Sequence, residues 1–120
     1  MTATVDMQKL EQFMGQMVGY MTGGAMCFGV LLGDELGLYR VLTEVGPASA
    51  DDVANKAGCN TRLVREWLDG QVAGGLVTWD ANADRYALTP EAVMALADDN
   101  SPAFVARGMN AFASMFIDVD

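Results

Sequence analysis

The stretch from Ser49 to Leu88 limits what this chain can fold into more than any other part of it. Its pattern predicts a short helix that stops at Gly58, a tight turn, and a second helix over Thr61 to Val72. The segments LVTW and RYAL predict two short strands joined by the loop Asp80 to Asp84. Two helices followed by a hairpin make a winged helix-turn-helix, a module that serves both as a DNA reader and as a dimerisation domain.

Local signals place the starts of several helices. Ser49 is a strong N-cap, and Asp52 stands three residues later at the capping-box position. Thr89, followed by proline, predicts a further short helix over Glu91 to Ala97. Ser101, also followed by proline, predicts the start of a last helix. Its apolar face is expected at Phe104, Val105, Met109, Phe112, Met115 and Phe116.

The second helix of the module occupies the position of a DNA-recognition helix. Its spacing predicts two ion pairs one turn apart, Arg62–Glu66 and Arg65–Asp69. Arginines paired in this way form a self-neutralised surface, whereas a groove-reading helix needs unpaired cations or amides near its start. Asn60 is expected to cap the helix. The predicted core face consists of Leu63, Val64, Trp67, Leu68 and Val72.

Charge and residue inventory narrow the function further. The formal net charge of −9 disfavours nucleic acid and anionic lipid as partners. There is no histidine, and Cys27 and Cys59 have neither metal-ligand spacing nor a disulfide framework, which favours a cytoplasmic location. The sequence contains no G-x-G, P-loop, G-x-S-x-G or H-E-x-x-H motif. We therefore predict no catalytic, cofactor-binding or metal-binding residue in this chain.

From Met7 onward, apolar residues recur at alternating steps of three and four, which is the pattern of a heptad seam. A second face carries Gly15, Gly19 and Gly23, which lets another backbone approach closely but costs the helix about 1 kcal/mol per glycine. Such a helix needs a partner to hold it. One continuous helix and a helix that bends or breaks near Gly23 and Gly24 both fit the pattern.

The seam predicts a subunit interface, because two apolar faces on one helix exceed what a domain of 120 residues can cover. Packing of the same methionines against the winged-helix body is the simpler alternative. We assign the dimer interface to Leu10, Met14, Met17, Met21, Phe28 and Leu31. Candidate contacts to an apolar ligand or substrate are Phe13, Tyr20 and Met26.

The uncharged stretch from Gln12 to Gly33 is long enough to span a bilayer. Its glycines and polar residues, and the acidic flank at Asp34 and Glu35, argue against a span. A buried interface helix is the better interpretation.

Four phrases carry a resemblance to a known family: LGDELGLYRVL, SADDVANKAGCNTRLVREWLDGQVAGGLV, RYALTPE and DDNSP. Together they resemble the N-terminal region of a bacterial S-adenosylmethionine-dependent methyltransferase family of class I. Its members are often called transcriptional regulators because of their helix-turn-helix. The resemblance covers roughly Gly29 to Pro102 and is strongest from Gly58 to Val77.

The resemblance implies a winged-helix domain that forms a homodimer and helps to close a substrate pocket, followed by a Rossmann-like domain that binds S-adenosylmethionine. The sequence stops where that domain should begin, so we expect a fragment of a longer enzyme or a stand-alone homologue, inactive alone. The expected fold is mainly α with a small β-hairpin. Interface helices occupy 1–48, the winged-helix module 49–97 and a C-terminal helix 98–120.

Three functions stay in competition. The first is a dimerisation and substrate-capping domain of a small-molecule methyltransferase. The second is a DNA-binding regulator that presents Arg62 and Arg65 on its recognition helix. The third is a stand-alone dimeric module that binds an apolar small molecule. The acidic balance, the acidic wing and the paired arginines weigh against the second, and the resemblance favours the first.

Overall fold

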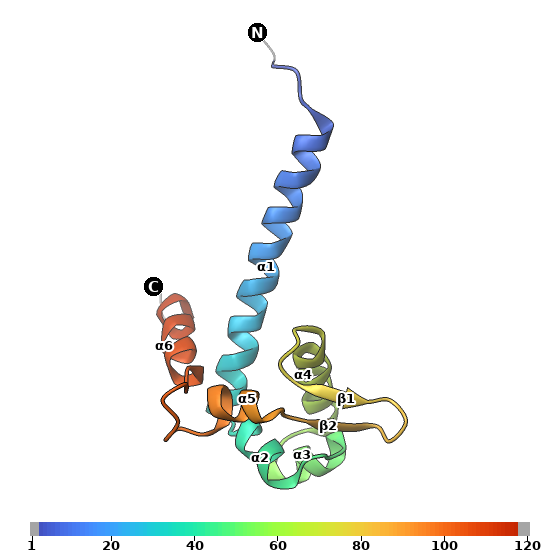
Figure 1. Cartoon of the computed structure of the whole chain (residues 1–120), viewed down its shortest axis with the longest axis vertical. Helices are drawn as coiled ribbons and strands as arrows, with labels where there is room; N and C mark the ends of the chain where they lie inside the picture. Colours follow the sequence, from blue (N-terminus) through green and yellow to red (C-terminus); the bar gives the residue numbers. More distant parts are fainter. Residues whose placement is uncertain (1–2, 118–120) are drawn as a thin grey trace.

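The computed structural model describes residues 3–117 (Figure 1). The elements in chain order are α1 (Met7–Glu35), α2 (Leu38–Val45), α3 (Ala50–Ala57), α4 (Thr61–Ala73), β1 (Thr78–Asp80), β2 (Arg85–Ala87), α5 (Pro90–Ala92), the π-helical turn η1 (Val93–Ala97) and α6 (Ala106–Ile117). The strands β1 and β2 form an antiparallel hairpin with Trp79 opposite Tyr86. This mainly helical winged helix-turn-helix confirms the predicted fold class.

The predicted caps are present. The Ser49 hydroxyl accepts from the Asp52 N–H at 3.1 Å, and the Asp52 carboxylate accepts from the Ser49 N–H at 3.5 Å, which completes the capping box of α3. Asn60 accepts from the Leu63 N–H at 3.2 Å and so starts α4. The Thr89 hydroxyl caps α5. Short polar side chains thus fix the entry to each of these helices.

α1 runs through its glycines as one helix of 29 residues, about 43 Å long. Asp6 caps its first turn by accepting from the N–H groups of Gln8 and Lys9. The chain then reverses at Gly37, whose φ of 69° lies in the left-handed region that favours glycine. Among residues 3–117, no helix is long and apolar enough to cross a membrane.

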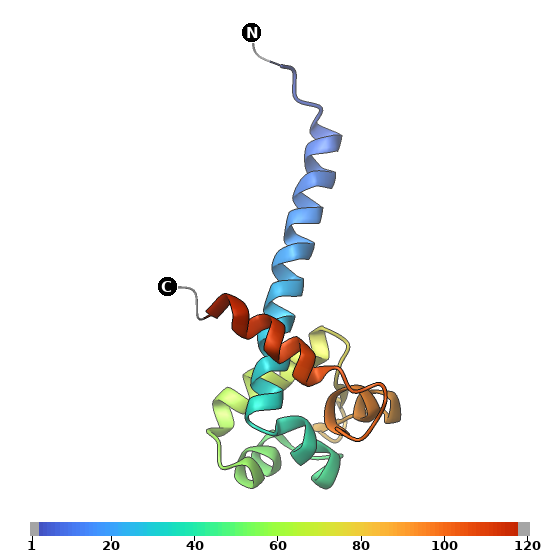
Figure 2. The same ribbon diagram turned by 90° about the vertical axis from the view of Figure 1, so that its left-hand side faces the viewer.

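Most of α1 projects from the rest of the molecule (Figures 1 and 2). The radius of gyration is 17.5 Å and the principal extents are 62 × 39 × 28 Å. A compact domain of this length has a radius of gyration of about 14 Å. The extra size comes from the N-terminal half of α1, which no other element accompanies in either view.

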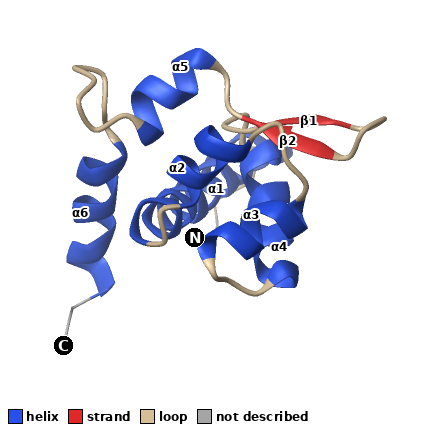
Figure 3. Cartoon of the chain, turned by 90° about the horizontal axis from the view of Figure 1, so that it is seen from below, coloured by secondary structure: helices blue, strands red, loops and turns tan. Residues whose placement is uncertain are grey.

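Two apolar clusters build the body. The larger one joins α2, α3, α4 and the hairpin, with Leu42, Leu68 and Tyr86 at its centre. The smaller one joins the C-terminal end of α1 to η1 and α6 through Val30 and Tyr39. Seen from below, α6 and α4 lie on opposite sides of α1 (Figure 3). The body therefore packs only against the last turns of α1.

Two predictions about helix faces and ends are wrong. Leu63 was assigned to the core face of α4 but is 63% exposed, because it points into an open groove beside α1. The last helix begins at Ala106 and not at Ser101, because the Ser101 hydroxyl and carbonyl accept bonds that close a turn. Phe104 and Val105 precede the helix, and the Val105 N–H donates to the Ala95 carbonyl at 2.9 Å.

Candidate subunit interface on α1 and its flanking grooves

The residues predicted to form the dimer interface lie almost entirely on the surface. Leu10, Met14, Met17, Met21 and Phe28 are exposed, and Met21 is the most accessible at 74%. Leu31, the sixth, is half-buried on the α1 side that meets α6. A monomeric protein rarely exposes a contiguous apolar patch larger than a few hundred Å², so this surface is the candidate site.

The exposed apolar surface is longer than the predicted seam. At 3.6 residues per turn, one side of α1 carries apolar residues from its first turn to its C-cap. We call this the seam stripe: Met7, Leu10, Met14, Met17, Val18, Met21, Ala25, Phe28, Leu32 and Leu36. All ten are exposed. Sequence reasoning missed Val18, Ala25, Leu32 and Leu36, although the same helical spacing contains them.

The total surface supports the same conclusion. The chain exposes 8062 Å². A compact monomer of 12.8 kDa exposes roughly 6,300 Å². The excess of roughly 1,800 Å² comes with the projecting helix, and a standard protein interface buries about 800 Å² per partner. The exposed helix can thus supply an ordinary interface.

An apolar groove of about 600 Å³ lies between the C-terminal end of α1 and α4. The seam stripe contributes Leu32 and Leu36 to its floor. Its opposite wall comes from α4 and the turn before it, namely Cys59, Asn60, Leu63, Val64, Glu66 and Trp67, with Leu38 at the base. We call this the α4 groove, and Leu63 is exposed because it faces this space.

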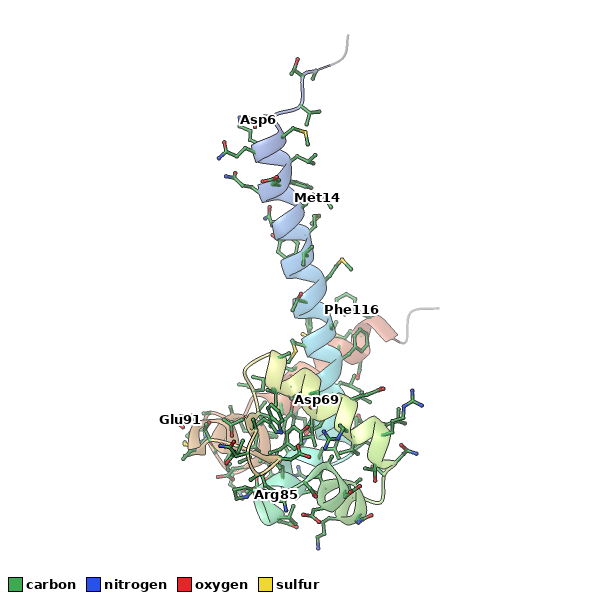
Figure 4. All side chains as sticks on the ribbon, turned by 90° about the vertical axis from the view of Figure 1, so that its right-hand side faces the viewer. Asp6, Met14, Asp69, Arg85, Glu91 and Phe116 are labelled. Atoms are coloured by element: carbon green, nitrogen blue, oxygen red, sulfur yellow. The ribbon has the colours of Figure 1, made fainter. Side chains whose placement is uncertain are left out.

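A second apolar groove, of about 270 Å³, lies on the other flank of the stripe, between α1 and α6. Phe28 and Cys27 line its α1 side, and Phe112 and Phe116 line its α6 side. The two α6 rings pack edge to face with centroids 5.1 Å apart. We call this the α6 groove. Figure 4 shows Phe116 beside α1 and Met14 farther along the helix, clear of the body.

A tight aromatic contact anchors α1 to the winged helix. Gly33 lies directly against the rings of Tyr39 and Trp67. The indole N–H of Trp67 donates to the Gly29 carbonyl at 2.8 Å. The Tyr39 hydroxyl donates to the buried side chain of Gln71. Burial, with the nearby Asp34 carboxylate as a lesser cause, raises the pKa of Tyr39 well above its usual value, so the donor stays protonated.

Polar bonds attach α6 to the same end of α1. The Asn110 amide donates to Asp34 at 2.8 Å and to Glu35 at 3.1 Å. Arg107 lies 3.7 Å from the Asp34 carboxylate, whose side chain is only 7% exposed. These contacts hold α6 beside α1 and keep the α6 groove in shape.

The three candidate ligand contacts do not meet in one cavity. Phe13 and Tyr20 are exposed on the projecting part of α1, where Tyr20 accepts from the Gln16 amide at 2.7 Å. Met26 is half-buried on another side of α1, against Gly74. Their role in ligand binding stays a prediction. Among residues 3–117, no group of three or more acidic or cysteine side chains could hold a metal ion.

The surface of α4 and the wing is self-neutralised, but one of its predicted ion pairs is wrong. Arg62 pairs with Glu66 at 3.7 Å, as the spacing predicts. Arg65 pairs instead with Asp84 at 2.7 Å, because the hairpin folds back across α4. Asp69 does not pair with Arg65 but accepts a hydrogen bond from the Tyr86 hydroxyl at 2.6 Å.

Asp84 connects the wing tip to α4 through a hydrogen bond from Arg65. It accepts from the Trp79 indole at 3.0 Å as well as from Arg65, and these two hydrogen bonds lower the pKa of its carboxyl group. The carboxylate is therefore charged at neutral pH. A wing that contacts phosphate needs free cations, whereas Asp84 neutralises the helix beside it. The cation of the wing itself, Arg85, donates to the backbone carbonyls of Ala83 and Asp84.

The comparisons with known proteins place this geometry in a family. Residues 24–98 match the model of the Rv2258c-like winged HTH domain. The chain belongs to this family. A comparison with curated proteins finds no match.

Solved structures share the fold of the family member described here. Human N-acetylserotonin methyltransferase in complex with SAM matches 93% of this chain with a TM-score of 0.72 and 20% identity. PigF with SAH matches 87% with a TM-score of 0.68 and 18% identity. A putative O-methyltransferase from Nostoc punctiforme PCC 73102 matches 80% with a TM-score of 0.61 and 24% identity.

The chain spans about a third of the length of these structures, covering 32%, 29% and 27% of them. The family match and these three likenesses confirm the resemblance inferred from the sequence. At such identities the likeness establishes the fold alone. The division of the chain at residues 48 and 97 stays a prediction.

Proposed function

We propose that this chain is the dimerisation and substrate-capping region of an S-adenosylmethionine-dependent methyltransferase that acts on a small molecule. The observation that carries the proposal is the seam stripe, which runs exposed along the whole of α1. The likeness to human N-acetylserotonin methyltransferase in complex with SAM and to PigF with SAH supports it.

The composition of the stripe suits association between subunits. Its methionines are flexible and can adapt to a partner surface. An exposed apolar helix that lacks tertiary contacts is marginal in water, and the glycines of α1 weaken it further. Pairing of two α1 helices would bury the stripe and supply the packing that the helix lacks.

The α6 groove is the candidate for substrate capping. It presents two phenylalanine rings around an apolar space of about 270 Å³, and Met115 on the same helix is 71% exposed. Flat apolar compounds bind in such aromatic-lined spaces. The sequence contains no G-x-G turn, so the residues of this chain do not fit a binding site for S-adenosylmethionine. We assign cofactor binding and methyl transfer to a catalytic domain elsewhere in the enzyme.

Sedimentation velocity over a range of protein concentrations tests the interface. We expect a homodimer for the chain and a monomer for Met17→Glu, because a charge at the centre of the stripe would be buried without a partner. Gln12→Glu adds the same charge on another side of α1 and should stay dimeric. A Met17→Glu chain that remains a dimer with unchanged affinity contradicts the proposal. If that variant is insoluble, Met21→Lys repeats the test with the opposite charge.

The gene itself tests the link to methyl transfer. Codons after Asp120 that encode an acidic residue followed by a G-x-G-x-G turn would support the proposal. A stop codon directly after Asp120 would leave a stand-alone module, and a thermal-shift series with planar apolar compounds would then examine ligand binding to the α6 groove.

A DNA-binding regulator is the second candidate, because the fold is a winged helix-turn-helix. The ion pairs of Arg62 and Arg65 and the net charge of −9 oppose it. Titration of a labelled DNA duplex at low salt should give no salt-dependent shift. Binding that weakens steeply with added salt would favour the regulator instead.

A further inference from the structure

The C-terminal helix α6 packs small side chains against α1 and leaves most of its large ones exposed. The α6 face on α1 consists of Ala106, Asn110 and Ala113, which are all buried and follow one another at steps of four and three. Phe112 and Phe116, by contrast, are exposed. Large apolar side chains normally hold a helix in place by burying their surface. Two alanines bury little surface, so the attachment of α6 depends on other contacts.

The first turn of α6 is fixed to the body. Ala106 is buried in the smaller apolar cluster, and Met109 packs against the same cluster. The N–H of Val105, the residue before the helix, donates to the Ala95 carbonyl in η1 at 2.9 Å. The last carbonyls of a helix have no partner within it, so this bond satisfies a polar group that would otherwise need water. The start of α6 is therefore its anchored end.

One turn further along, polar bonds hold α6 to α1. The Asn110 amide donates to Asp34 at 2.8 Å and to Glu35 at 3.1 Å, and its oxygen accepts from the Ser114 hydroxyl at 3.2 Å. We call the Asn110 amide and its two acids the latch. A hollow of about 420 Å³ borders the latch, with Arg107 on its wall. Water that enters this hollow can replace the hydrogen bonds of the latch, so opening it costs a modest free energy.

The α6 groove lies beyond the latch, towards the C-terminal end of the helix. Phe112 and Phe116 line it on α6, opposite Cys27 and Phe28 of α1. Figure 2 shows α6 lying across α1, with its last turns to one side of the long helix. The groove measures about 270 Å³, just below the range of about 300–1,000 Å³ that is usual for small-molecule pockets. A ligand of ordinary size therefore needs this groove to widen.

We propose that α6 is a hinged lid over the α6 groove and that Asn110 is the positioning residue that keeps the lid closed. The anchored first turn is the hinge, the latch comes next, and the groove comes last along the helix. A rotation about the hinge that breaks the latch therefore widens the groove and leaves the winged helix unchanged. The inference rests on substrate capping by the α6 groove, proposed above, and adds how a ligand gains access.

The reactivity of Cys27 reports whether the lid is open, because this half-buried thiol lines the groove. N-ethylmaleimide labels the full chain, and peptide mass spectrometry follows Cys27 and Cys59 separately. Cys59 lies in the α4 groove, on the other side of α1, and is the internal control (Figure 3). Asn110→Asp places a third carboxylate in the latch and should open it by like-charge repulsion. We expect Cys27 to react about tenfold faster or more, and Cys59 to react at the parent rate.

Two further variants make the test specific. Asn82→Asp makes the same chemical change on the exposed wing and should leave both labelling rates unchanged. Asn110→Ala removes the amide donors without adding a charge, and it repeats the test if the aspartate variant does not fold. Equal Cys27 rates in the Asn110 variants and in Asn82→Asp would overturn the inference.

Urea distinguishes opening of the lid from unfolding of the whole chain. Opening of one helix exposes little surface, so the Cys27 rate should depend only weakly on urea below the unfolding transition. A Cys27 rate that rises with urea as steeply as global unfolding does would show that α6 does not move separately, and the lid would be rejected.

A ligand probe separates this inference from the proposed function. N-phenyl-1-naphthylamine is aromatic, apolar and uncharged at neutral pH. Bound in the α6 groove, it should slow the labelling of Cys27 and not that of Cys59. Protection of Cys27 by the probe, with equal Cys27 rates in Asn110→Asp and Asn82→Asp, would leave substrate capping intact and reject the lid. Faster labelling of Cys27 in Asn110→Asp without protection by the probe would support the lid and contradict substrate capping.

Discussion

Replacing Gly33 with alanine should destabilise the protein, although alanine is the better helix former. Gly33 is buried on α1 beneath the rings of Tyr39 and Trp67. An added Cβ would lie 2.7 Å from Cζ2 of Trp67 and closer still to the ring of Tyr39. Neither ring can retreat freely, because Tyr39 is bonded to Gln71 and Trp67 is bonded to the backbone of α1.

Two opposing effects set the magnitude. Overpacking a buried site costs about 1–3 kcal/mol, and two fixed rings place this site at the upper end of that range. The gain in helix propensity from glycine to alanine is at most about 1 kcal/mol. The free energy of unfolding should therefore fall by about 1–2 kcal/mol, measured by denaturant titration at one protein concentration so that association is held constant.

Gly19→Ala is the matched control in the same helix. A Cβ at Gly19 meets nothing within 4 Å, so only the propensity gain remains. This variant should be more stable than the parent by about 0.5–1 kcal/mol. Opposite signs for the two substitutions are the expected result. A Gly33→Ala protein as stable as the parent would refute the tight contact between α1 and the two rings.

Three further predictions concern the body. Burial, with the hydrogen bond to Asp69 as the next cause, raises the pKa of Tyr86 to about 12. The folded state thus holds this proton more tightly than the unfolded state, so the stabilisation is complete below about pH 10 and is lost as the pH rises towards 12. Denaturation curves of Tyr86→Phe from pH 9 upward should show a smaller loss than the parent does. Trp67→Phe removes the bond to the Gly29 carbonyl and should cost about 1 kcal/mol in a chemical denaturation series. Asn60→Ala removes the cap of α4 and should cost about 1 kcal/mol by the same assay, whereas Asn60→Asp should retain most of the stability.

Local chemistry made the winged helix predictable from sequence. Capping at Ser49 and Asn60 depends on atoms within three residues, so the boundaries of α3 and α4 follow from the sequence alone. The seam on α1 was equally accessible, because helical spacing alone identifies its exposed side. The sequence pattern did not decide whether the helix continues through Gly24, because it shows no partner that would hold the helix there.

Long-range contacts explain what the sequence did not reveal. Arg65 has an acid one turn away on its own helix, yet it pairs with Asp84 across 19 residues because the hairpin returns over α4. Leu63 has the spacing of a core residue, but its environment depends on where α1 passes. The two grooves arise from the placement of α1, α4 and α6, which are distant in sequence, so no local sequence pattern predicts them.

The seating of α1 on two aromatic rings has a mechanical consequence. The helix is held near Gly33, and its free end at Met7 lies about 39 Å away along the axis. With that lever arm, a tilt of about 5° at the seat moves the tip by about 3 Å, more than half a helical turn of rise. Small changes in how Tyr39 and Trp67 pack are thus amplified at the far end. In the proposed dimer, the packing of Tyr39 and Trp67 would therefore set how accurately two subunits meet.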